Sequence, residues 1–89
     1  MRFEWDAAKA RINKAKHGVD FDLAPEFDFA NAVIAIDDSE IHGEERLVAT
    51  CIIGLSVYVM VYVERDDTIR VISLRKAKKK EIADYVENL

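Results

Sequence analysis

The sequence contains few residues that break regular structure and almost none that can cross-link it. Among its 89 residues are one proline, three glycines and a single cysteine, Cys51. One cysteine cannot form an internal disulfide, so we expect a reducing compartment, the cytoplasm. The scarcity of breakers, together with 51% hydrophobic residues, excludes a disordered chain. We therefore expect one folded domain over residues 1–89.

Membrane and metal signals are also missing. No run of about 18 apolar residues occurs, which predicts no membrane span. The N-terminus begins with Arg2, Glu4 and Asp6 rather than a basic region followed by an apolar one, so we expect no signal peptide. His17 and His42 are far apart in the sequence, and no cysteine accompanies either of them at metal-ligand spacing. The sequence therefore predicts neither a metal nor a cofactor.

Charge is distributed unevenly along the chain, although the net charge is only −4. Residues 1–17 carry five basic and two acidic side chains, residues 18–67 carry two and twelve, and residues 68–80 carry six and none. If the fold brings the two basic segments together, they form one positive surface for a phosphate-bearing partner. The simpler alternative is a pair of solvated helix faces.

A helix near the N-terminus is the best-defined predicted element, preceded by a short extended lead-in over residues 2–5. Asp6 is a good N-cap, and Gly18 after His17 is the usual left-handed stop. Helical spacing predicts an apolar stripe with a cationic stripe beside it. The apolar stripe is Ala8, Ile12 and Ala15, and the neighbouring stripe is Lys9, Asn13 and Lys16, with Trp5 on the same side.

The remaining pattern predicts an α+β fold in which N-terminal helices precede an antiparallel meander of three to four strands and a C-terminal helix. Residues 21–29 contain Pro25, which a short helix capped by Asp22 tolerates in its first turn. Segments rich in β-branched residues, separated by tight turns, predict antiparallel neighbours. The predicted strands are 32–36, 46–53, 57–65 and 68–75, with an acidic loop over 37–45, and the last helix has the stripe Ile82, Tyr85, Val86 and Leu89.

Alternation along the last two strands predicts what lies on each face of the sheet. The valines at positions 57, 59, 61 and 63 point to one face, which we expect to be the core. A two-residue turn that pairs Arg65 with Thr68 adds Ile72 and Leu74 to that face. The opposite face is then either a site or an ordinary solvated face with an ion pair. Its members are Tyr58, Tyr62, Glu64, Ser73 and Arg75.

Two blocks of the sequence resemble the BrnT family of type II toxins. The first is Phe3-Glu4-Trp5-Asp6 with Lys9, Asn13, Lys16-His17-Gly18-Val19, Phe21 and Ala24. The second is Glu44-Glu45-Arg46, Ile53-Gly54, residues 61–65 and residues 69–77, closing with Glu81 and Tyr85. The resemblance implies a RelE-like fold, RNA cleavage that inhibits translation and growth, and neutralisation by a BrnA-type antitoxin encoded beside it. That antitoxin is a DNA-binding protein, so the chain would form a hetero-oligomer and contact DNA only through it.

RNA cleavage without a metal needs a base for the ribose 2′-hydroxyl, cations for the phosphate and an acid for the leaving oxygen. Arg75 and Arg65 are our candidates for the phosphate, with Arg46 as a third, because a guanidinium matches two phosphate oxygens. Glu64 is the only carboxylate that alternation predicts beside Arg75. It would act either as the general base or as an ion-pair partner that orients an arginine. The unperturbed pKa of histidine is near neutrality, so His17 is either a general acid, a general base or a helix cap.

The predicted RNA contacts surround these candidates. Lys9 and Lys16 are expected to contact phosphates, and Trp5 either stacks on a base or packs in the core. The other candidates for RNA binding are Tyr62, Arg70 and Lys76. The alternative function is a non-catalytic corepressor that binds the antitoxin and has weak or lost ribonuclease activity, which the acidic middle of the chain favours.

Overall fold

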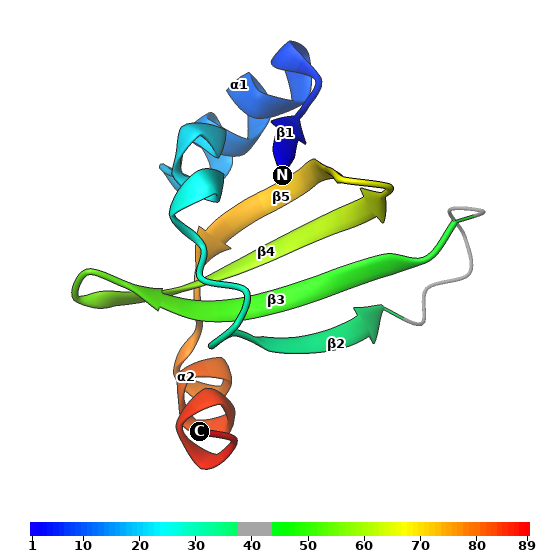
Figure 1. Cartoon of the computed structure of the whole chain (residues 1–89). Coiled ribbons are helices and arrows are strands. Elements are labelled where there is room, and N and C mark those ends of the chain that lie inside the picture. Colours follow the sequence, from blue (N-terminus) through cyan, green and yellow to red (C-terminus); the bar gives the residue numbers. More distant parts are fainter. Residues whose placement is uncertain (38–43) are drawn as a thin grey trace.

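The computed structural model describes residues 1–37 and 44–89, which form an α+β fold around a five-stranded sheet (Figure 1). The strands lie in the order β1-β5-β4-β3-β2, with β1 parallel to β5 and all other neighbours antiparallel. The elements are β1 (Arg2–Glu4), α1 (Ala7–His17), the 3₁₀ helix η1 (Phe21–Glu26), β2 (Val33–Asp37), β3 (Arg46–Ile53), β4 (Ser56–Arg65), β5 (Thr68–Lys76) and α2 (Lys79–Glu87). His42 and most of the predicted acidic loop lie outside the described residues.

The predicted meander of four strands is confirmed, but the sheet has a fifth strand that the sequence pattern does not reveal. β1 was expected to be an extended lead-in, and it pairs with the first half of β5 through Phe3 and Ile69. Three residues are too few to show an alternating pattern, and their partner lies far along the chain. The N-terminus is thereby fixed beside the strand that carries Arg70, Arg75 and Lys76.

The main core lies on the face of the sheet that carries Met60 and Tyr62, which we call the core face. Both side chains are at most 1% exposed, and they pack with Phe21 and Ala24 of η1. The opposite surface, the valine face, carries Val59, Val61 and Val63 and meets α2 at one end. The prediction that the tyrosine face is either a site or a solvated face is therefore wrong, whereas Val59 and Val63 of the valine face are buried as predicted. Because β4 is the central strand, both of its faces are shielded, and alternation alone cannot tell which face has the larger cover.

A β-bulge in β5 reverses the predicted faces of its second half. Arg65 pairs with Thr68 as predicted, but the register shifts by one residue between Val61 and Tyr62 of β4. After the shift, Leu74 pairs with Met60 on the core face, whereas Arg75 pairs with Val59 on the valine face. A bulge inserts one residue into a strand, and every later side chain moves to the other face. The predicted neighbours Glu64 and Arg75 therefore lie on opposite faces of the sheet.

The boundaries of α1 are confirmed, but its predicted apolar stripe is wrong. The Asp6 carboxylate accepts from the backbone N–H groups of Ala8 and Lys9 at 2.8 and 3.3 Å, and Gly18 ends the helix at a φ of 72°. Ile12 is 66% exposed, while Asn13 is buried. The reason is that α1 lies along the edge of β5 rather than over an apolar surface, and an exposed strand edge needs hydrogen bonds.

Asn13 joins α1 to that strand edge, and its replacement by leucine should lower the free energy of unfolding by about 2–4 kcal/mol. Its Nδ2 donates to the carbonyls of Leu74 at 2.8 Å and Val19 at 3.1 Å, and its Oδ1 accepts from the Leu74 N–H at 3.2 Å. Leucine has a similar volume but leaves these buried backbone groups without partners. Urea unfolding measures the change. Asn31→Leu, at an exposed position, should shift stability by no more than about 0.5 kcal/mol, and an equal loss in both variants would contradict the role of Asn13.

The two remaining helices differ in detail from their predictions. η1 is a 3₁₀ helix whose N-cap position is Asp20 rather than Asp22, and Asp20 makes no side-chain cap there. Of the predicted α2 stripe only Tyr85 is buried, whereas Val86 and Leu89 are 59% and 78% exposed. Within the described residues, no helix combines the length and apolar character needed to cross a bilayer.

Candidate functional site

Arg75 is half-buried at the end of β5, where the neighbouring Lys76 and Lys78 are exposed. Its guanidinium nitrogens donate to both carboxylate oxygens of Glu81 on α2, at 2.7 and 2.8 Å. The two side chains are only 24% and 32% exposed. One of the same nitrogens also donates to the Lys76 carbonyl at 3.4 Å. A guanidinium has five N–H donors, so this arrangement fixes the plane of Arg75 and leaves two donors for a bound anion.

The hydrogen bonds from Arg75 hold the pKa of Glu81 at about 2, below the ordinary value of 4.5. Because this pKa is lowered by folding, the pair stabilises the protein fully above pH 4.5, and its contribution is lost as pH falls towards 2. We expect a loss on the order of 1–2 kcal/mol after solvent screening is allowed for. Urea unfolding at a series of pH values should show this loss. Glu81→Gln should remove it, whereas the exposed Glu87→Gln should retain it, and identical profiles for both variants would contradict the assignment.

A shallow hollow of about 190 Å³ lies between α1 and β5, and Arg75 follows two residues after its lining residue Ser73 on the same face of the strand. Lys9, Lys16 and His17 line it from the helix, and Ser73 lines it from the strand. Burial and the nearby positive charges of Lys16, Arg75 and Lys78 lower the pKa of His17 below its ordinary value of 6.5. The imidazole is therefore neutral at physiological pH and can accept a proton.

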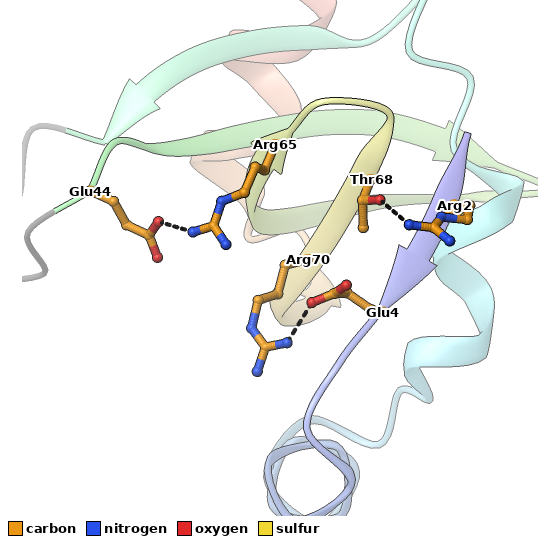
Figure 2. Close-up of polar contacts among 6 residues, drawn as sticks. All are labelled: Arg2, Glu4, Glu44, Arg65, Thr68 and Arg70. Atoms are coloured by element: carbon orange, nitrogen blue, oxygen red, sulfur yellow. Dashed lines mark hydrogen bonds and ion pairs between the residues drawn. The ribbon is translucent and has the colours of Figure 1, made fainter.

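A second group of arginines lies on the valine face at the other end of β5 (Figure 2). Arg70 donates to Glu4 of β1 at 2.7 Å, and Arg65 donates to Glu44 at 2.9 Å. Arg2 completes the group and contacts the Thr68 hydroxyl at 3.4 Å. These side chains surround a hollow of about 210 Å³. The ion pairs are exposed, so a phosphate can compete with the carboxylates at little energetic cost.

The two arginine groups lie along the same strand. Arg70 and Arg75 are both on the valine face, five residues apart, which is roughly 15 Å along a strand. The expected convergence of the two basic segments therefore exists at the Arg75 end, where α1 contributes Lys16 and His17. Arg65 and Arg70 extend the positive surface away from it.

Several predicted site residues lie elsewhere. Tyr62 is 1% exposed, and its ring packs on Phe29 at 5.5 Å, so it cannot contact RNA from the core; burial also raises the pKa of its phenol. Glu64 is exposed but lies on the core-face side, opposite Ile69. Trp5 is half-buried and packs edge-on against Phe21 at 5.9 Å.

Two further candidates, Arg46 and Lys76, also lie apart from Arg75. Arg46 is half-buried on the valine face opposite Asp37, and its Nε has no hydrogen-bond partner within the described residues. Lys76 is exposed and pairs with Tyr58, so its side chain points to the core-face side. Neither adds to the hollow beside Arg75.

Sequence reasoning did not single out Glu81 as the partner of Arg75, or Arg2 as a member of the second arginine group. Glu81 had a detectable signal, because it is placed to accept from the backbone N–H of Lys78 at 2.8 Å as an N-terminal helix cap. No sequence signal pointed to Arg2, because its position depends on the pairing of β1 with β5.

Comparison with known proteins gives a family match and matches among solved structures. The model of a family described as the ribonuclease toxin BrnT of type II toxin–antitoxin systems matches residues 5–81. The 1.1 Å crystal structure of the Brucella abortus ribonuclease toxin BrnT is similar, with a TM-score of 0.70 and 27% identity, covering 89% of this chain and 99% of that one. No curated protein was found to match the chain. The family match includes both α1 and the hollow beside Arg75.

Proposed function

Because the chain belongs to the BrnT family of ribonuclease toxins of type II toxin–antitoxin systems, we propose that it cleaves RNA at the hollow between α1 and the end of β5. The observation that supports this most directly is the guanidinium of Arg75, which two hydrogen bonds to Glu81 hold on the same strand whose Ser73 lines the hollow with His17. A guanidinium that binds the phosphate through paired N–H donors and a general base are two of the groups that the reaction needs.

In the proposed reaction, the neutral imidazole of His17 takes the proton of a ribose 2′-hydroxyl. The 2′-oxygen attacks the adjacent phosphorus, and the bond from phosphorus to the 5′-oxygen breaks. Arg75 stabilises the charge on the non-bridging oxygens, and an ammonium group of Lys9 or Lys16 protonates the leaving oxygen. The products are a 2′,3′-cyclic phosphate and a free 5′-hydroxyl, and no step requires a metal or cofactor.

The second arginine group extends the proposed RNA site. Arg70 and Arg65 would bind phosphates of the same strand farther along β5, in exchange for their contacts with Glu4 and Glu44. We propose that RNA lies along the valine face of β5, where Arg65, Arg70 and Arg75 lie.

The cellular part of the proposal follows from the family. A toxin of a type II system has an antitoxin partner, and we propose that it is of the BrnA type, that it forms a hetero-oligomer with the toxin, and that it alone contacts DNA. The site of action would be the cytoplasm, where RNA cleavage stops translation and growth.

Incubation of the antitoxin-free chain with RNA in EDTA tests the activity. We expect cleavage that leaves cyclic phosphate ends, which metal-activated water would not produce. A parallel reaction in a translating extract with its normal magnesium tests whether the message must be held on a ribosome. Folded protein that cleaves RNA in neither reaction would support the non-catalytic corepressor instead.

A further inference from the structure

The β2 edge of the sheet is apolar and exposed. Within the described residues, β2 pairs only with β3, at the opposite edge of the sheet from β1 and the first half of β5. Ile34 and Ile36 are 45% and 56% exposed, on the core-face side where they pair with Ala49 and Leu47. Edge strands are usually guarded by a charge, a proline or a bulge, and β2 has none of these before its last residue, Asp37. An edge of this kind favours pairing with a strand from another chain.

Acidic residues lie near both ends of β2. Among the described residues these are Asp28, Glu44 and Glu45, and Asp37, the last residue of β2, is opposite Arg46 of β3. At one end of β2, Asp28 is exposed, and its carbonyl lies 3.9 Å from the Cys51 sulfur of β3. At the other end, Glu44 and Glu45 are exposed next to the start of β3. A segment that docks on β2 therefore meets negative charge at both ends of the strand.

We propose that the antitoxin binds here by adding a strand of basic and apolar side chains to β2. This inference rests on the proposed function, because it takes the antitoxin as the partner. Main-chain hydrogen bonds to the free edge and contacts with Ile34 and Ile36 provide affinity, and the acidic surroundings attract a basic segment. A second copy of this chain would bring the same negative charges to the contact and be repelled, and RNA would be repelled for the same reason.

The position of this edge separates partner binding from catalysis. β5, which carries Arg75, lies three strands from β2 in the sheet. A strand added at β2 does not cover the hollow beside Arg75. Variants of β2 should therefore lose antitoxin affinity without losing RNA cleavage.

The test uses the full chain and the antitoxin encoded beside its gene. Hydrogen exchange of the β2 amides should slow at least about tenfold in the complex, because they gain hydrogen bonds. The double variant Ile34→Lys/Ile36→Lys should raise the Kd for the antitoxin at least about tenfold through like-charge repulsion. Leu55→Lys, at a fully exposed hairpin tip, is the matched control, and its Kd should change by less than about twofold.

A complex in which β2 exchange is unchanged would overturn the inference, as would failure of the two proteins to associate. A free chain that is dimeric and has protected β2 amides would also overturn the inference, because a second copy of the chain would then occupy the β2 edge. The exchange measurement on wild type decides the matter even if the double variant does not fold. Binding with protected β2 but no RNA cleavage by the free chain would contradict the proposed function and leave this inference intact.

Discussion

Replacing Arg75 with alanine is expected to reduce RNA cleavage by about 100-fold or more, because it removes the cation proposed to stabilise the phosphate in the transition state. Glu81 fixes this guanidinium through two hydrogen bonds, so its orientation is set before RNA binds. Arg75→Lys keeps the positive charge but loses the paired N–H donors of the guanidinium, so its cleavage rate should lie between those of Arg75→Ala and wild type. Rates measured under single-turnover conditions separate this loss from weaker RNA binding.

Arg11→Ala is the matched control for this prediction. Arg11 is an exposed arginine on α1 and does not line the hollow. Its removal should leave the single-turnover rate within about twofold of wild type. Because Arg75 also ties α2 to the sheet, unfolding curves of each variant must accompany the rates. A folded Arg75→Ala protein that cleaves RNA at the wild-type rate would remove the central residue from the mechanism.

The pH dependence of cleavage should report the titration of His17. A general base acts in its neutral form, so activity should rise with pH through the pKa of His17 and level off above it. In the free protein that pKa lies below the ordinary value of 6.5. Bound phosphate favours the imidazolium, so the rise in kcat should occur at a higher pH than the rise in kcat/KM. His17→Gln should lower the rate by about 100-fold or more and abolish this rise.

The other histidine provides the control. His42→Gln changes the same chemical group at a residue that has no role in the proposed reaction, and should keep both the rate and its pH dependence. A His17→Gln protein with an unaltered pH profile would show that another group accepts the proton. Arg75→Ala would still be expected to lose activity in that case, so the two predictions are independent.

Local signals predicted the elements of the fold well. Asp6 and Gly18 define α1 through their own backbone geometry, and the turn between Arg65 and Thr68 is set by two residues. The bulge in β5 could not be predicted in this way. It brings Leu74 into the core opposite Met60 and presents its backbone to Asn13 of α1, so it depends on contacts distant in sequence. The pairing of β1 with β5 also depends on residues far apart in the sequence, so local signals could not predict it either.

The candidate site was predicted in part. The charge pattern predicted one positive surface only if the fold joined the two basic segments, and α1 does pack against the second half of β5 through Asn13 and Leu74. The predicted partnership of Glu64 with Arg75 was wrong because the bulge separates their faces, and the carboxylate that binds Arg75 is Glu81 on α2. Tyr62 was misassigned because an aromatic residue on the central strand packs as readily in a core as in a binding site.

Titration of the chain with an RNA oligonucleotide in which every ribose is 2′-O-methylated, followed through its backbone amide chemical shifts, tests the location of the RNA site most directly. Such RNA binds but cannot be cleaved, because the attacking hydroxyl is blocked. The largest shifts should occur at Lys16, His17, Ser73 and Arg75, with smaller ones near Arg70 and none along β2. Shifts centred on β2 and η1, or spread evenly over the sheet, would contradict the proposed site.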